Sequence, residues 1–376
     1  MMDATKQLLR DLLGDLLCID STPGREGEIG RYLCELLEPR GFVLTRQPVP
    51  PQAGSDPVAE RYNLILTRGE PRLFLFGHLD TVPPAGGGGN EWTRPPLGAT
   101  EEEGRLYGLG AVDMKGGIAA FLGAVLATEP EHLGICLTCD EEGQFLGIRT
   151  FLARGGFAGA LPELAVFAEP TDLRIINRHR ACFEVDFQVG GRAAHAGAPE
   201  LGRDASQLYG CLTALKGELQ SDYPGTDFNI GFFQSGRLDA INVVPDQARA
   251  VIDVRPASTL HREGVGHIVR RATALIEGCG LTVSHQVNID MKPLDVDPEL
   301  LEPLSEAVRE VGLEVVFAQL DGTSEAGEVH FRLGVPCVHF GPGPQAMSHQ
   351  VDEYVDLSML ANSQRVFERL IAKFQR

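Results

Sequence analysis

The first part of the chain alternates helical and extended hydrophobic patterns. The predicted helices are Lys6–Leu17, Glu26–Leu37 and Ile118–Ala127, and the predicted strands are Asn63–Thr67, Arg72–Phe76, Ile135–Thr138 and Leu164–Phe167. Helices that alternate with short apolar strands predict a mostly parallel α/β sheet. Ligands of such sheets bind beyond the carboxyl ends of the strands, so we expect the chemistry on loops that directly follow apolar runs.

The pattern changes in the middle of the chain, where polar and apolar residues alternate as in strands with one exposed face. The recognisable elements there are strand Cys182–Val189, helix Ala205–Leu219, strand Ala248–Val254, helix His261–Ile276 and strand Leu281–Val287. With one further strand that the pattern does not delimit, they fit a β-α-β-β-α-β layout, which is typical of a ferredoxin-like domain. We therefore expect residues 178–290 to form an inserted α+β domain.

The α/β pattern resumes after this insert. The last predicted elements are helix Pro298–Val311, strands Glu314–Phe317 and Pro336–Phe340, and helix Leu357–Phe374. The sequence thus predicts a discontinuous α/β/α domain formed by residues 1–177 and 291–376.

Composition excludes several classes of protein. The 376 residues are 43% hydrophobic and 23% charged, as in ordinary globular proteins, and the length suits two domains. The net charge of −19 makes nucleic acid an unfavourable partner. The apolar runs are far shorter than a bilayer requires, so no membrane segment is expected.

Cysteine usage favours a reducing compartment. Eight cysteines are scattered along the chain, and the helical, acid-bearing start does not resemble a signal peptide. We expect free thiols in the cytoplasm. Cys136 and Cys139 form a CxxC, but positions three apart on a strand face opposite sides, which favours packing over metal binding.

Candidate chemistry begins after the second apolar strand, where His78 and Asp80 occur as FGHLDTVPP. A metal-bound imidazole works best when a carboxylate holds its other nitrogen, and the His-x-Asp spacing suits that pairing. Further along, the glycine-rich stretch Tyr107–Gly117 surrounds Asp113. It lacks the third glycine of a dinucleotide-binding loop, so we interpret it as a tight turn that presents one carboxylate to two cations.

Three more strand ends carry potential ligands. Strand Ile135–Thr138 runs into Asp140-Glu141-Glu142-Gly143, strand Leu164–Phe167 ends before Glu169, and His349 follows the last strand. Adjacent side chains diverge, so one of Glu141 and Glu142 can bind metal while the other moves protons. Two histidines and three carboxylates (His78, Asp113, Glu142, Glu169 and His349) supply two metal sites that share one carboxylate.

Five motifs in this order, GHLDTVP, LYGLGAVDMKGG, DEEG, AEPT and SHQVDEY, resemble the dinuclear zinc deacylases and exopeptidases. That family includes aminoacylase, succinyl-diaminopimelate desuccinylase and acetylornithine deacetylase, and further segments of this chain are most similar to the last. The resemblance implies two divalent metal ions, with zinc expected and cobalt as the alternative.

The resemblance also implies a role for each matching residue. Asp113 bridges the metals, His78 and Glu169 complete one site, and Glu142 and His349 complete the other. Asp80 orients His78, Glu141 is the general base, and a cis peptide joins Asp113 to Met114.

In the insert, the resemblance implies a lid that forms a homodimer. His195 reaches the active site of the second subunit, and Asn242 and Arg255 contact the substrate. The implied substrate is a small N-acyl amino acid, foremost N-acetylornithine. The alternatives are N-succinyl-diaminopimelate, N-acetylcitrulline and N-acetyllysine.

Two rival functions remain open from the residues alone. A serine hydrolase would use Ser324 in Gly322-Thr323-Ser324-Glu325-Ala326, although this stretch lacks the final glycine of a nucleophile elbow. A binding protein without activity would have kept the fold but not the catalytic set.

Overall fold

The apolar run at Leu73–Phe76 forms the middle of a large sheet, as its uninterrupted hydrophobicity predicts for a strand covered on both faces. The computed structural model describes residues 2–51, 60–84, 91–157 and 159–375, and side chains from residue 5. The chain divides into two compact units. Unit 1 comprises Met1–His179, Leu294–Leu320 and Ser324–Arg376, and unit 2 comprises Arg180–Pro293 with Asp321–Thr323.

The large sheet of unit 1 is parallel at its centre and antiparallel towards its edges. Its strands lie in the order β1 (Val43–Pro48), β2 (Tyr62–Arg68), β6 (Leu133–Thr138), β3 (Leu73–His78), β7 (Leu164–Phe167), β15 (Cys337–His339), β8 (Ile175–His179) and β13 (Leu294–Asp295), and β14 (Phe317–Leu320) also pairs with β8. The parallel strands β6, β3 and β7 end at the same edge, which places the segments that follow them side by side.

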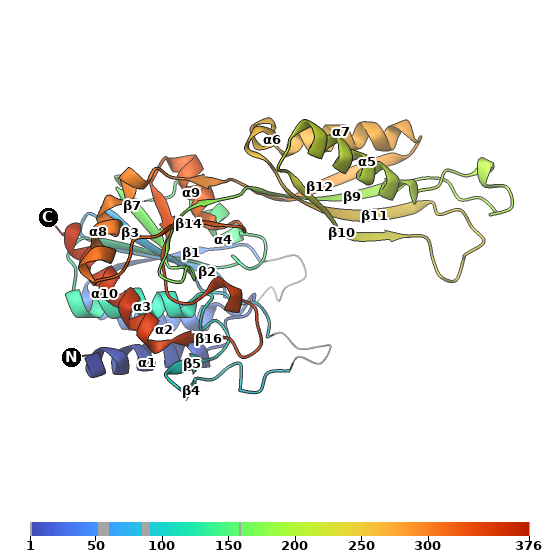
Figure 1. Ribbon diagram of the computed structural model, residues 1–376. Helices are drawn as coiled ribbons and strands as arrows, with labels where there is room; N and C mark the ends of the chain where they lie inside the picture. Colours follow the sequence, from blue (N-terminus) through green and yellow to red (C-terminus); the bar gives the residue numbers. More distant parts are fainter. Residues whose placement is uncertain (1, 52–59, 85–90, 158, 376) are drawn as a thin grey trace. The chain divides into compact units, whose positions relative to one another are not determined.

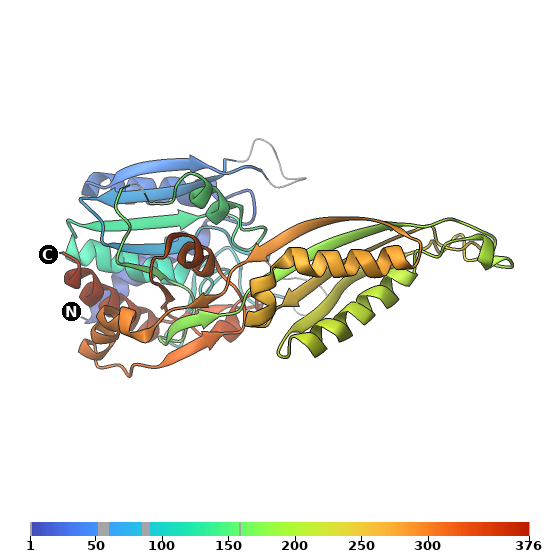
Figure 2. The same ribbon diagram turned by 90° about the horizontal axis from the view of Figure 1, so that it is seen from above.

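Helices cover both faces of this sheet. They are α1 (Met2–Cys18), α2 (Gly27–Leu37), α3 (Lys115–Thr128), α4 (Leu146–Ala153), α8 (Glu302–Glu310), α9 (Glu325–Leu333) and α10 (Leu357–Lys373), with short 3-10 turns at Glu38–Arg40, Pro298–Leu301 and Gln345–Met347. Figures 1 and 2 show α4 and α9 on one face and α1, α3 and α10 on the other. A small sheet joins β16 (Tyr354–Asp356), β5 (Arg105–Tyr107) and β4 (Thr100–Glu102).

Gly117, in the first turn of α3, lies against the backbone of Ala168. A Cβ atom at position 117 would be 1.8 Å from the carbonyl oxygen of Ala168, so only glycine permits this contact. Ala168 directly precedes Glu169, and α3 directly follows the loop that carries Asp113. The missing side chain at Gly117 therefore lets these two carboxylates approach each other.

Unit 2 is a four-stranded antiparallel sheet with two long helices on one face (Figures 1 and 2). In chain order its elements are β9 (Cys182–Gly190), the 3-10 turn Pro199–Leu201, α5 (Gln207–Asp222), β10 (Asp227–Ser235), β11 (Gln247–Arg255), α6 (Ser258–Glu263), α7 (Val265–Gly278) and β12 (Thr282–Met291). The strand order β10-β11-β9-β12 is that of a ferredoxin-like domain, so the predicted fold class is confirmed. The predicted insert boundaries, 178 and 290, lie a few residues before those of unit 2.

Several elements differ from the sequence-based expectation; the helix predicted over His261–Ile276, for example, is divided into α6 and α7 at Gly264. The alternating pattern gave no separate strand at β10, because a bulge between Ile230 and Phe232 interrupts its alternation. The strand predicted over Glu314–Phe317 is wrong in position, since β14 begins at Phe317, where pairing with β8 starts. Partner strands rather than β-branched residues alone set this boundary.

Within the described ranges, no helix is both long enough and apolar enough to span a bilayer.

Replacing Gly117 tests the close contact between α3 and Ala168. Gly117→Ala should lower the free energy of unfolding by about 1–3 kcal/mol, because the added methyl group forces the backbones apart. Gly217→Ala in α5 is the control: nothing lies within 4 Å of the added carbon, so the variant should gain about 0.5–1 kcal/mol of stability. Urea unfolding followed by Trp92 fluorescence and circular dichroism measures both. An unchanged Trp92 transition in Gly117→Ala would contradict the contact.

Candidate metal centre

His78, the last residue of β3, presents one ring nitrogen to a carboxylate. Its Nδ1 lies 2.8 Å from the backbone oxygen of Asp80, which can only accept, so Nδ1 carries the proton. Its Nε2 then faces Oδ1 of Asp113 at 3.1 Å. Two lone pairs this close need a proton or a cation between them, which is how a metal-binding pair is arranged.

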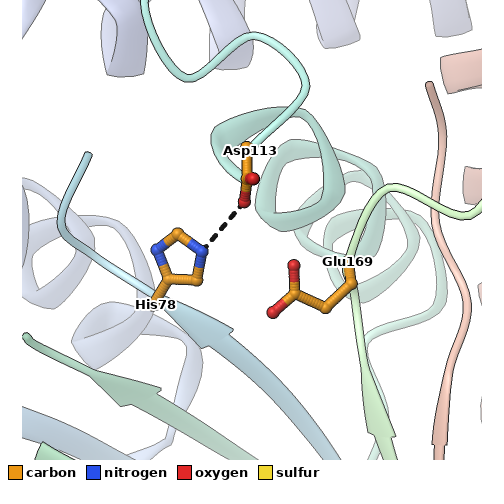
Figure 3. Close-up of side chains that lie close together, drawn as sticks. All are labelled: His78, Asp113 and Glu169. Atoms are coloured by element: carbon orange, nitrogen blue, oxygen red, sulfur yellow. Dashed lines mark hydrogen bonds and ion pairs between the residues drawn. The ribbon is translucent and has the colours of Figure 1, made fainter. Parts of the chain in front are cut away.

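Asp113 stands between two sets of donor atoms. Ligand atoms of His78, Asp113 and Glu169 lie within 4.8 Å of one another, and so do those of Asp113, Glu142 and His349. Figure 3 shows the Asp113 carboxylate pointing at the His78 ring, with Glu169 beside them. Oδ2 of Asp113 is 3.6 Å from Nε2 of His349, so its two oxygens face different sets.

The side chain of His349 closes the second set. Its Nε2 lies 2.9 Å from Oε1 of Glu142, and this contact, with the charge of Asp113, raises the pKa of His349 to about 9 against the effect of burial. For His78, burial disfavours the charged ring, but the hydrogen bond to Asp113 and the charges of Glu169 and Glu141 prevail and raise its pKa. Both imidazoles therefore face an excess of negative charge.

The carboxylates themselves repel one another. Burial, together with the charges of Asp113, Glu142 and Glu325, raises the pKa of Glu169 to about 8, although His78 opposes the shift. Burial likewise raises the pKa of Glu141 well above its usual value, and Glu142 and Glu169 add to the effect. Nitrogen and oxygen donors with this charge excess fit divalent cations that would compensate it.

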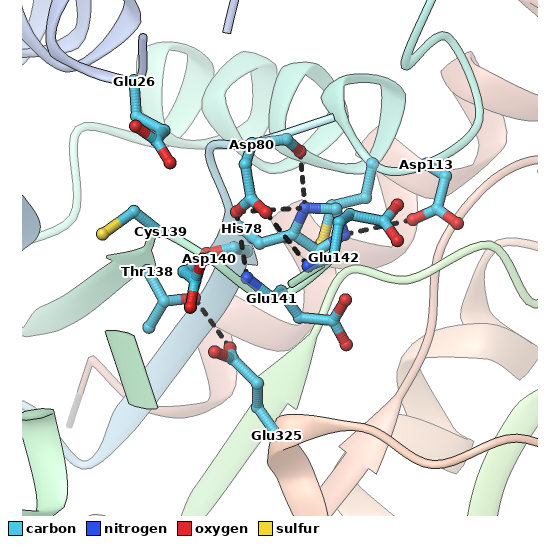
Figure 4. Close-up of polar contacts among 12 residues, drawn as sticks. Glu26, His78, Asp80, Asp113, Thr138, Cys139, Asp140, Glu141, Glu142 and Glu325 are labelled. Atoms are coloured by element: carbon cyan, nitrogen blue, oxygen red, sulfur yellow. Dashed lines mark hydrogen bonds and ion pairs between the residues drawn. The ribbon is translucent and has the colours of Figure 1, made fainter. Parts of the chain in front are cut away.

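Asp80 acts differently from the expectation that its side chain holds His78. Its backbone oxygen makes that contact, and its carboxylate oxygen Oδ1 is 4.0 Å from Nδ1 of His78. The Asp80 carboxylate accepts hydrogen bonds from the backbone N–H groups of Glu141 (3.1 Å) and Glu142 (3.0 Å), as Figure 4 shows. Asp80 thereby fixes the turn that carries both glutamates.

Asp140 also stabilises the turn that carries Glu141 and Glu142. Its carboxylate accepts from the N–H groups of Gln144 and Leu146 and pairs with Arg61 at 2.7 Å. Arg61 also reaches Glu26 at 3.0 Å, and all three ionic side chains are almost fully buried. Asp140 is thus committed to an internal ion pair.

Glu353 holds the glycine-rich loop. Its buried carboxylate accepts hydrogen bonds from the backbone N–H groups of Gly110 (2.9 Å), Val112 (2.7 Å) and Asp113 (3.0 Å). The peptide bond between Asp113 and Met114 is cis, as the resemblance implied. The SHQVDEY motif therefore contributes both His349 and the side chain that fixes Asp113.

Ser324 lies in a buried histidine cluster. Its Oγ is 2.7 Å from Nε2 of His339 and 3.3 Å from Nε2 of His179, and it also accepts from the N–H of Ala326 at the start of α9. Among the described residues, His339 Nδ1 has no hydrogen-bond partner, so no carboxylate orients this base as in a catalytic triad. Ser324 is only 3% exposed, which further disfavours a nucleophile.

The residues expected to contact substrate from the insert all belong to unit 2. His195 is exposed and pairs across a short bridge with Val243, while the backbone oxygen of Asn242 accepts from Ala196 N–H at 2.8 Å. His195 and Asn242 thus lie side by side in one projection, which is formed by the loops that follow β9 and β10. Arg255 ends β11 and forms a bidentate pair with Asp253 (2.9 and 3.0 Å).

Comparison with known proteins identifies the family of this chain. The family model described as Peptidase family M20/M25/M40 matches residues 74–373. The chain belongs to that family. The resemblance inferred from the motifs is thereby confirmed, and the protein is an M20 metallohydrolase.

The relatives of this chain within family M20 carry different activities in their names. The chain is 29% identical to the acetylornithine deacetylase of Photorhabdus laumondii (91% of this chain, 89% of the relative) and 30% identical to that of Myxococcus xanthus (99% of both). It is 28% identical to a probable carboxypeptidase of Aspergillus terreus (95% and 84%).

Solved structures confirm the fold. A tripeptidase of Staphylococcus aureus has a TM-score of 0.79 at 21% identity, over 99% of both chains. The Bacillus subtilis YXEP protein, a dinuclear metal-binding peptidase of family M20, has a TM-score of 0.71 at 18% identity, again over 99% of both chains.

Sequence reasoning missed the residues that support this M20 site. Glu353 lies within a quoted motif, but its partners are about 240 residues away along the chain. Glu325 follows Ser324 in the sequence, and its buried carboxyl group lies 2.7 Å from the Thr138 hydroxyl group (Figure 4). Its charge adds to the effect of burial in raising the pKa of Glu141. The signal that could have indicated these two residues is the presence of further acidic side chains close to the ends of predicted strands.

Replacing Glu353 tests whether it holds Asp113 in place. Glu353→Gln should weaken divalent metal binding about 10–100-fold, because an amide NH₂ would face a backbone N–H that now meets an oxygen. The control is Asp352→Asn, since the Asp352 carboxylate binds Thr93 and Arg94 instead. Calorimetric titration with Zn²⁺ measures both variants. Equal affinities in the two variants would contradict the role of Glu353.

Proposed function

We propose that this chain hydrolyses the amide bond of a small N-acyl amino acid, with N-acetylornithine as the expected substrate. The carrying observation is the single carboxylate of Asp113 between two N/O donor sets, with Glu141 beside them. Acetylornithine deacetylases of about 29% identity match nearly the full length of the chain, which supports this choice of substrate.

Two divalent ions fit the two donor sets, with zinc expected and cobalt as the alternative. His78 and Glu169 would hold one, Glu142 and His349 would hold the other, and Asp113 would contribute to both. Bound there, the two ions would lower the pKa of the attacking water and polarise the acyl oxygen.

Glu141 is the general base in this proposal. It accepts a proton from the attacking water as the acyl carbon is attacked, and it returns the proton to the leaving amine. Burial and the charges of Glu142 and Glu169 raise the pKa of Glu141, which favours uptake of a proton at this position. Asp80 contributes by fixing the turn, not by touching the substrate.

The insert is proposed to act across a homodimer. His195 would stabilise the oxyanion in the second subunit's site. Asn242 and Arg255 would bind the substrate, and the Arg255 guanidinium would pair with the carboxylate of the substrate. Support comes from the exposure of the projection that carries His195, where Leu238 is 99% and Ile241 is 85% exposed. Apolar side chains so exposed are typical of surfaces that a partner covers. To bind the substrate, Arg255 would have to give up part of its bidentate contact with Asp253.

Peptides are the second class of substrate, because relatives include a probable carboxypeptidase and a tripeptidase. A panel that contains N-acetylornithine, N-acetylcitrulline, N-acetyllysine, N-succinyl-diaminopimelate and di- and tripeptides separates the two. We expect the highest kcat/KM for N-acetylornithine and loss of that activity on chelation with EDTA. Preference for a peptide would overturn the substrate, whereas full activity after proven metal removal would overturn the mechanism.

The two adjacent glutamates should separate metal binding from chemistry. Glu141→Gln should keep near-normal metal content but lose about 10²–10⁴-fold in kcat, because only the proton acceptor is lost. Glu142→Gln should instead lose metal, which elemental analysis of the purified variants measures. If both variants kept their metal and stayed active, the two roles would be wrongly assigned.

Complementation tests the proposed homodimer. His195→Ala and Glu141→Ala subunits, each nearly inactive alone, should regain activity when mixed, because one site of the heterodimer combines an intact Glu141 with an intact His195. The recovered rate should track the heterodimer fraction measured by native mass spectrometry. Proven heterodimers without activity would show that His195 does not act across subunits.

A further inference from the structure

Two cysteine thiols of unit 2 are in direct contact. Sγ of Cys211, on α5, lies 3.5 Å from Sγ of Cys279, which directly follows α7. Cys211 is buried, with 7% of its surface exposed, whereas Cys279 is exposed. The start of α5 therefore meets the end of α7, and these two helices lie side by side on the sheet (Figure 2).

The surroundings permit the two sulfurs to approach further. A disulfide requires an S–S bond of about 2 Å, and contact at 3.5 Å leaves a gap that side-chain rotation can close. Cys279 is flanked by Gly278 and Gly280, and Gly280 has a positive φ of 73°. Glycines on both sides give the backbone the freedom to adjust as the bond forms.

We propose that Cys211 and Cys279 form an intramolecular disulfide by exchange with low-molecular-weight disulfides such as oxidised glutathione. The Cys279 thiolate attacks one sulfur of the small disulfide, whose S–S bond breaks and releases one thiolate. The sulfur of Cys211, as its proton leaves, attacks Sγ of Cys279 and releases the second thiolate. The two protein thiols are oxidised, the small disulfide is reduced to two thiols, and the two protons end on these products.

The order of attack follows from exposure. Cys279 can meet a reagent from solvent, whereas burial and the contact with Cys279 raise the pKa of Cys211 to about 11. A buried thiol of this kind reacts slowly with a reagent but readily with a sulfur already beside it. Cys211 thus acts as the resolving thiol.

The bond would tie down the base of the projection that carries His195. The backbone oxygen of Gly280 accepts a hydrogen bond from Nη1 of Arg203 at 2.7 Å, and the backbone of Arg203 pairs with that of Arg192. The disulfide also closes the long loop between residues 211 and 279, which constrains the unfolded chain. Oxidation should therefore raise the unfolding midpoint of unit 2.

The experiment treats the full-length protein with oxidised glutathione and maps its cysteines by mass spectrometry without reduction. Wild type should yield a Cys211–Cys279 peptide pair. Cys211→Ser should stop at glutathione bound to Cys279, and Cys279→Ser should form neither product. Cys18→Ser, which removes the other exposed thiol, should still form the pair.

Urea unfolding gives a second readout. Oxidised wild type should unfold at higher urea than reduced wild type, and Cys279→Ser should show no such difference. Glutathione that stays on Cys279 in wild type, or disulfides only between molecules, would overturn the proposal, because the neighbouring thiol would then have failed to react.

Discussion

Repulsion among buried carboxylates is the constraint on which this structure depends. Asp113, Glu141, Glu142 and Glu169 converge at one edge of the unit 1 sheet, and burial raises the pKa values of the three glutamates. Burying like charges together is unfavourable unless cations or protons compensate. The two imidazoles share the cluster but do not balance it. Cations or protons must therefore compensate the cluster, and its nitrogen and oxygen donors fit divalent cations.

A cluster that repels itself must be held by the surrounding backbone. Asp80 anchors the turn with Glu141 and Glu142, Glu353 anchors the loop with Asp113, and Arg61 neutralises Asp140 beneath them. Each of these carboxylates accepts hydrogen bonds from backbone N–H groups or from a guanidinium. Such charge-assisted hydrogen bonds are stronger than those between neutral groups. Glycine at position 117 lets α3 approach the strand end at Glu169. The scaffold therefore positions the candidate ligand residues.

Local patterns were enough to predict the fold class, the strand ends and the motif residues, because hydrophobic periodicity and strand-end polarity are properties of neighbouring residues. Contacts between distant segments could not be predicted in this way. Glu353 and Asp113 are distant in the sequence and come into contact only in the folded chain. A bulge interrupts the alternating pattern of β10, and pairing with β8 determines where β14 begins. The orientation of His78 shows the same limit: the sequence pointed to Asp80, but the backbone oxygen rather than the carboxylate makes the contact. The roles of the metal ligands, of Glu141, and of His195, Asn242 and Arg255 stay predictions.

Anomalous diffraction from crystals of the zinc-loaded protein, measured on both sides of the zinc edge, tests the central claim most directly. The account predicts two zinc peaks at the unit 1 sheet edge, one beside His78 and Glu169 and one beside Glu142 and His349. Both peaks should lie within bonding distance of Asp113, about 2.0–2.2 Å for a carboxylate oxygen. A single peak, or two peaks that do not share Asp113, would contradict it.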